Sequence, residues 1–92
     1  MYSQNEQKLP ANAIIMLRFL HDHGRKTQKE IINTLNLPIR SVRYCIRRLM
    51  ERGLIVKYPN LKDMRSVFYQ LAADKLHEVE TILEEEGYDV TA

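Results

Sequence analysis

The 92-residue sequence has little cysteine, glycine or proline, and it has no long hydrophobic run. Its single cysteine, Cys45, cannot form a disulfide within the chain, which favours a reducing compartment. No apolar stretch reaches the roughly 18 residues of a membrane span, so we expect no membrane partner. The polar stretch at residues 1–7 does not resemble a signal peptide, and we therefore expect a cytoplasmic protein.

The sequence also lacks the patterns of enzymes and metal sites. It has no glycine-rich phosphate loop and no nucleophile motif, so we expect no enzymatic activity. Its histidines and Cys45 match no standard zinc spacing, and His21 and His23 lie two residues apart on a predicted helix, where they point in different directions. We expect no metal and no cofactor, and we interpret Cys45 as a buried core thiol.

Charge is unevenly distributed around a net value of only +2. Residues 38–71 contain eight basic and two acidic residues, a net charge of +6. Residues 72–92 contain one basic and seven acidic residues, a net charge of −6. A basic middle beside an acidic end indicates a surface that binds a polyanion on one side of the molecule.

Hydrophobic periodicity predicts one core domain with the element order helix, helix, helix, strand, strand, helix. The helices are expected at about 10–23, 27–36, 39–52 and 73–86, and the strands at 54–58 and 66–71. Thr27 and Glu30 match a capping box, and Asn36 suits the left-handed end of a helix. The fold class is mainly α with a small β-hairpin (α+β), with a flexible tail at 1–9, the domain at 10–71 and a C-terminal helix at 72–92.

Helices 27–36 and 39–52 are typical of a helix-turn-helix, in which the second helix lies in the DNA major groove. One side of helix 39–52 is apolar, and arginines, which pair with guanine, fill the other side. We expect base contacts from Arg40, Ser41, Arg43, Tyr44 and Arg47. Phosphate contacts are expected from Thr27, Gln28, Lys29, Arg48 and Lys57.

The connection between the two strands, residues 59–66, is interpreted as the wing of a winged helix-turn-helix. Its tip, Lys62-Asp63-Met64-Arg65, is basic. A cationic hairpin beside a recognition helix can reach the minor groove, where arginine is favoured electrostatically. We expect this contact from Lys62, Asp63 and Arg65.

From Thr27 to Leu71 the sequence resembles the winged-helix domain of MarR-type and related archaeal transcription regulators. The resemblance is carried by residues 27–31, 37–42, 48–55 and 62–66, and the Asp-x-Arg pattern of the wing is its most specific part. It implies that Arg65 enters the minor groove and that Asp63 orients it. Full-length MarR proteins have extra terminal helices that build a dimer and an effector pocket, so a small-molecule effector is left open here.

The last predicted helix has an apolar stripe that packs on the first helix, pairs with a second copy, or does some of both. We expect a homodimer, because operators are usually two-fold and one small module binds weakly. The stripe consists of Leu76, Val79, Ile82 and Leu83.

The sequence thus predicts a sequence-specific regulator of transcription that binds double-stranded DNA. One alternative is a winged-helix protein-interaction module, or a subunit of transcription or replication machinery, that docks through the acidic last helix. Another is binding of structured RNA, which the narrow A-form major groove disfavours.

Overall fold

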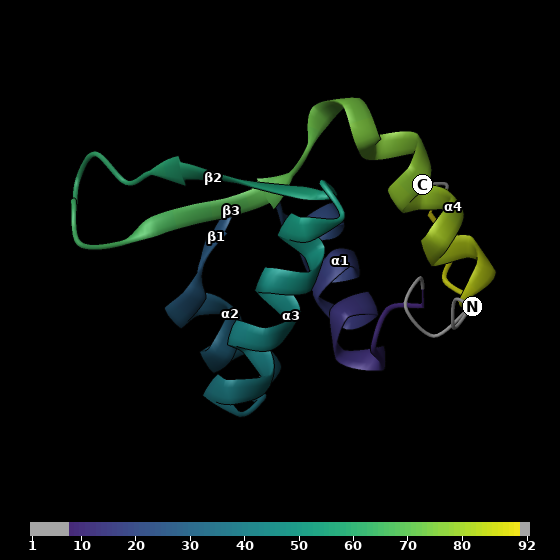
Figure 1. Ribbon diagram of the computed structural model, residues 1–92, viewed down its shortest axis with the longest axis horizontal. Coiled ribbons are helices and arrows are strands. Elements are labelled where there is room, and N and C mark those ends of the chain that lie inside the picture. Colours follow the sequence, from purple (N-terminus) through teal and green to yellow (C-terminus); the bar gives the residue numbers. More distant parts are fainter. Residues whose placement is uncertain (1–7, 91–92) are drawn as a thin grey trace, which may run out of the picture.

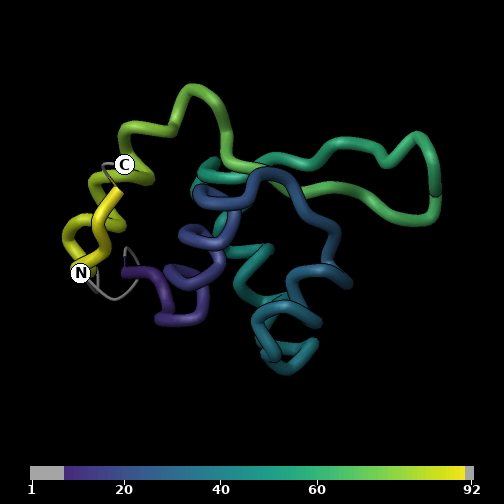
Figure 2. Tube along the Cα trace, turned by 180° about the vertical axis from the view of Figure 1, so that it is seen from behind, coloured from purple at the N-terminus to yellow at the C-terminus, as the bar shows by residue number. Residues whose placement is uncertain are grey.

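The computed structural model describes residues 8–90, which form a helical body with a long hairpin projecting from it (Figure 1). The elements in chain order are α1 (Ala11–His23), β1 (Lys26–Thr27), α2 (Gln28–Leu35), α3 (Ile39–Glu51), β2 (Ile55–Pro59), β3 (Val67–Leu71), the 3-10 helix η2 (Ala73–Lys75) and α4 (Leu76–Glu85). Seen from behind, the β2–β3 hairpin extends at one end of the molecule and α4 lies at the other (Figure 2).

The ends of α2 follow from local chemistry that the sequence predicts. The Thr27 hydroxyl accepts a hydrogen bond from the backbone N–H of Glu30 at 3.2 Å. The Glu30 carboxylate accepts one from the backbone N–H of Thr27 at 2.9 Å, which completes the predicted capping box. Asn36 ends α2 in the left-handed region with φ 55°, as predicted.

The sheet has one strand more than the sequence predicted. The short strand β1 pairs antiparallel with β3, aligning Lys26 with Tyr69 and Thr27 with Phe68, and the strand order is β1-β3-β2. Two residues are too few to show the alternation by which a strand is recognised. Because α2 begins at Gln28, directly after β1, this pairing holds the start of α2 beside the base of the wing.

The other boundaries differ from prediction by small amounts. The predicted helix 73–86 is divided into η2 and α4, and the predicted strand 54–58 runs instead over Ile55–Pro59. Ser66 lies outside β3 because its N–H donates to the backbone carbonyl of Asp63 and so belongs to the wing turn. Of the predicted tail 1–9, residues 1–7 lie outside the described residues, whereas Leu9 is buried in the core.

The core lies between α1, α3 and α4. The predicted apolar side of α3 is confirmed, with Val42, Cys45, Ile46 and Leu49 buried and Met50 packed at the edge. Burial raises the pKa of the Cys45 thiol, which keeps it protonated and unreactive. The buried side of α3 thereby fixes which residues its opposite side presents to solvent.

Helix α4 is held on α1 by apolar and polar contacts. Val79 and Leu83 are fully buried in the core of the single chain. The His21 ring on α1 lies between two carboxylates, with Nε2 3.0 Å from an oxygen of Glu80 and Nδ1 3.2 Å from an oxygen of Asp22. The predicted dimer residues are thus divided, because only Leu76, which is exposed, and Ile82, which is half-buried, remain to face a second copy.

The contact between α1 and α4 should make stability depend on pH near neutrality. The hydrogen bond to Glu80, followed by that to Asp22, raises the pKa of His21 above 6.5. Since the folded-state pKa exceeds the unfolded one, the stabilisation is complete below about pH 6.5 and is lost as pH rises through the folded-state pKa. Urea unfolding between about pH 5 and about pH 8 should show this fall in the free energy of unfolding.

His21→Gln should flatten that pH dependence, because glutamine has no charge to gain. His77→Gln is the matched control, since His77 is exposed on α4. The control should retain the fall of the parent protein. An equal fall in the His21→Gln variant would contradict the assignment to this side chain.

Candidate nucleic-acid interface

One side of α3 presents arginines to solvent. Arg40, Arg43 and Arg47 are exposed, and among residues 8–90 no carboxylate lies within ion-pair distance of their guanidinium groups. The Arg47 guanidinium lies 5.9 Å from the centroid of the Tyr44 ring, within the range of a cation–π contact. These side chains are therefore available to an external ligand.

Two further predicted contact residues on α3 lie off this face. Ser41 and Arg48 are both half-buried. Each follows an exposed arginine directly in sequence, so it lies about 100° further round the helix. A phosphate contact from Arg48 therefore has to come from the flank of α3 rather than from its centre.

The start of α2 contributes a second group of predicted residues. The backbone N–H and the hydroxyl of Thr27 both form hydrogen bonds with Glu30, so Thr27 stabilises the helix end. Any phosphate contact at this helix end would come from Gln28 and Lys29, of which Lys29 is exposed and Gln28 half-buried. The first-turn N–H groups of a helix favour an anion at this end.

The wing carries its arginine in a fixed orientation. One carboxylate oxygen of Asp63 accepts hydrogen bonds from the backbone N–H of Arg65 at 3.1 Å and from its Nε at 3.3 Å. The Arg65 side chain is nevertheless 92% exposed. Asp63 thus orients the Arg65 guanidinium, and the terminal N–H groups of that guanidinium stay free to bind a ligand.

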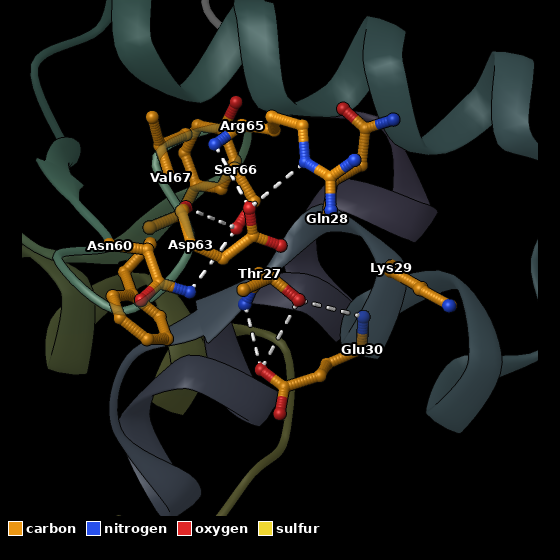
Figure 3. A pocket seen from close by; sticks show the side chains of 11 residues that line it. Thr27, Gln28, Lys29, Glu30, Asn60, Asp63, Arg65, Ser66 and Val67 are labelled. Atoms are coloured by element: carbon orange, nitrogen blue, oxygen red, sulfur yellow. Dashed lines mark hydrogen bonds and ion pairs between the residues drawn. The ribbon is translucent and has the colours of Figure 1, made fainter.

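A hollow of about 610 Å³ lies between the start of α2 and the wing (Figure 3). Its lining includes Gln28 and Lys29 from α2 and Asp63 and Arg65 from the wing. Figure 3 shows the Arg65 side chain reaching from the wing across this hollow toward Gln28. The predicted contacts of the wing and of α2 therefore face a common space.

A second hollow, of about 490 Å³, lies between α3 and β2. Its lining includes Arg43 and Arg47 from α3 and Lys57 from β2. Gln28 and Tyr69 line both hollows, so the two adjoin, and together they are called the concave surface. This surface brings together basic side chains from α2, α3, β2 and the wing, with the carboxylates of Glu30, Glu51 and Asp63 among them.

Sequence reasoning gave no role to two apolar side chains at the tip of the wing. Leu61 is 80% exposed and Met64 is 74% exposed. The signal for them was present, because they are the only large aliphatic residues in an otherwise polar and charged connection at 59–66. Tyr69, in the middle of β3, was also missed as part of the concave surface.

Residues 8–90 contain neither a metal-binding cluster nor a membrane-spanning helix. No group of three or more histidine, cysteine, aspartate or glutamate side chains there is placed to hold a metal ion. No helix in this range has the length and apolar character needed to cross a membrane.

A family model described as a winged helix DNA-binding domain matches residues 10–74. The predicted fold class, a winged helix-turn-helix of four main helices with a β wing, is confirmed. A search of curated proteins finds no match to the chain.

Solved structures of bacterial proteins share the fold. BpsR of Bordetella bronchiseptica, described as regulated in its DNA binding by 6-hydroxynicotinic acid, has a TM-score of 0.76 and 26% sequence identity, over 88% of this chain and 58% of that chain. YusO of Bacillus subtilis has a TM-score of 0.76 and 24% identity, over 87% of this chain and 57% of that chain. A mutant of MarR from E. coli, complexed with operator DNA, has a TM-score of 0.76 and 20% identity, over 94% of this chain and 61% of that chain.

The resemblance to MarR-type regulators is thus confirmed in the fold. The chain spans less than two thirds of the length of each of these three solved chains.

Proposed function

The chain belongs to the winged helix DNA-binding domain family, and we propose that it is a sequence-specific transcription regulator that binds double-stranded DNA. In this proposal α3 enters the major groove, where Arg40, Arg43, Tyr44 and Arg47 contact base edges. The wing lies at the minor groove with Lys62 and Arg65, and Gln28, Lys29 and Lys57 contact phosphates. The observation that carries the proposal is that α2, α3, β2 and the wing each contribute a basic side chain to the concave surface.

The distribution of charge supports the same orientation. The segment 38–71, which supplies α3 and the wing, has a net charge of +6, and the segment 72–92 has a net charge of −6. Helix α4 lies at the end of the molecule opposite the wing (Figure 1). DNA phosphates would repel the acidic end, so this polarity favours one docking orientation.

We further propose that the regulator is a cytoplasmic homodimer. A two-fold operator presents two half-sites, and one module of this size binds DNA weakly. Because Val79 and Leu83 are buried within the chain, the α4 contact in such a dimer would use Leu76 and Ile82.

Selection of bound fragments from a random pool of duplex DNA tests the proposal. Enrichment of one sequence is the expected result, and a palindromic sequence supports the homodimer. Fluorescence anisotropy with random duplex at low salt should also show weak, non-specific binding. No binding in either experiment would overturn the proposal and favour a protein-interaction module.

Replacing Arg65 with alanine should weaken binding and flatten its dependence on salt. Each phosphate-neutralising cation that is lost lowers the slope of log K against log salt by about 1. The measurement is a salt titration of the anisotropy of the selected duplex. Lys75→Ala is the control, because Lys75 pairs with Glu78 at 3.8 Å and lines neither hollow. An unchanged slope in Arg65→Ala would remove the wing from the interface.

A further inference from the structure

The tip of the wing exposes apolar surface at the place that the proposed function brings to DNA. Leu61, at 80%, and Met64, at 74%, are more exposed than any other large hydrophobic side chain in residues 8–90. Such exposure in water is unfavourable, and the two most exposed of these side chains lie three residues apart on one short turn. Lys62 and Arg65 stand next to these two side chains in sequence, and both are exposed.

The backbone of this turn is fixed by its own hydrogen bonds. The backbone N–H of Lys62 donates to the side-chain oxygen of Asn60 at 3.1 Å, and the N–H of Asp63 donates to the Asn60 carbonyl at 3.1 Å. The Asn60 amide also donates to the Ser66 hydroxyl at 3.2 Å, which closes the base of the tip. A turn that is ordered before binding loses little conformational entropy when it inserts into a partner.

We propose that Leu61 and Met64 form an apolar wedge that enters the DNA minor groove, partly unstacks one base step and bends the duplex there. This inference rests on the proposed function, and it adds a deformation of DNA to the contacts named above. Proteins that bind the minor groove use apolar side chains in this way, with cationic side chains beside them on the backbone. Leucine and methionine have the length and the apolar character that such a wedge requires.

The surroundings of the tip favour duplex DNA over a second copy of the chain. Asp63 and Arg65 line the same hollow as Gln28 and Lys29, so the tip borders the concave surface. The same cations would repel the tip of another copy, whereas phosphates on both sides of a groove attract them. The wedge would therefore contact the same DNA duplex as the concave surface.

A wedge of this kind would give the protein a preference for certain base steps at positions of the duplex where no side chain forms hydrogen bonds with a base edge. Pyrimidine–purine steps such as TA are the easiest to unstack and kink. The wing should therefore prefer these steps on the flank of each half-site that α3 reads.

The test uses the duplex recovered by selection, with a pair of fluorescent dyes at its ends and 2-aminopurine at steps under the wing. Energy transfer between the dyes reports bending, and 2-aminopurine fluorescence reports unstacking. Binding of the parent protein should increase both signals. The double variant Leu61→Gln with Met64→Gln should bind with an affinity lowered only several-fold, because Lys62 and Arg65 remain, but neither signal should rise above that of free duplex.

Ile15→Gln is the control, because it replaces an exposed aliphatic residue on α1 that lines neither hollow, and it should bend DNA like the parent. All three substitutions lie at exposed positions, so the thermal midpoints should stay unchanged. A parent protein that binds the duplex without bending or unstacking it would overturn the wedge and leave the proposed function intact. A double variant that bends DNA fully but loses self-association in sedimentation would also overturn it, in favour of a contact between copies. Failure of the parent to bind any duplex would overturn the proposed function itself.

Discussion

Replacing Arg47 with alanine should weaken binding to the selected duplex by roughly 1–3 kcal/mol, or about 5- to 150-fold. The guanidinium is exposed, lines the hollow between α3 and β2, and lies against the Tyr44 ring. A guanidinium held in this way can donate two parallel hydrogen bonds to the O6 and N7 atoms of guanine. Alanine removes both bonds, so the loss should be greatest for the duplex that carries the preferred base.

Anisotropy titrations with the selected duplex, and with duplexes changed at one base pair, measure this effect. Arg47→Lys keeps the charge but lacks the planar fork, so it should retain non-specific binding and lose discrimination at one position. Lys75→Ala is the control for loss of one positive charge, because Lys75 lies in η2 and pairs with Glu78 at 3.8 Å. An equal loss on selected and random duplexes would show that Arg47 contacts phosphate and does not read a base.

The helices could be predicted from the sequence because each one carries its own local signals. Thr27 and Glu30 specify the start of α2, and Asn36 specifies its end. The apolar residues of α3 repeat at helical spacing, so the buried side and the arginine side follow from one pattern. Such features depend on neighbours within one or two turns, all of which are visible in a linear sequence.

Features that depend on distant partners could not be predicted in the same way. Strand β1 exists only because β3 lies beside it, and the burial of Val79 and Leu83 depends on how α4 meets α1. Leu9 likewise looks like part of a polar tail, but it is buried in the core. A periodic apolar stripe predicts that one face of a helix is buried, but it does not identify the surface against which that face packs.

The candidate site likewise has a part that could be predicted from local sequence and a part that depends on distant residues. The residue types on α3 and the wing were visible in sequence, as was the pairing of Asp63 with Arg65 that the family resemblance implied. The concave surface that unites them was not, because it depends on Gln28 and Tyr69 meeting between α2, α3 and the sheet. The contacts with DNA themselves stay predictions, to be tested by the substitutions described above.

Replacing Leu49 with alanine should lower the free energy of unfolding by about 2–5 kcal/mol. Leu49 has 0% exposure and lies on the side of α3 opposite the arginines. Truncation removes buried apolar area and leaves a cavity beneath α3. A domain of this size is stable by only roughly 5–15 kcal/mol, so urea and thermal unfolding should show a large shift. Each kcal/mol lowers the Tm by roughly 4–8 °C.

Comparison of Leu49→Ala with Arg47→Ala separates scaffold from interface on a single helix. Leu49→Ala should lower the Tm and weaken DNA binding only through the unfolded fraction, so binding should recover on cooling to where the variant is folded. Leu49→Met conserves volume and should cost less than about 1.5 kcal/mol. Arg47→Ala should leave the Tm unchanged and weaken binding at every temperature. If Arg47→Ala instead destabilised the fold as much as Leu49→Ala, the exposed arginine side of α3 would be structural and the interface would lie elsewhere.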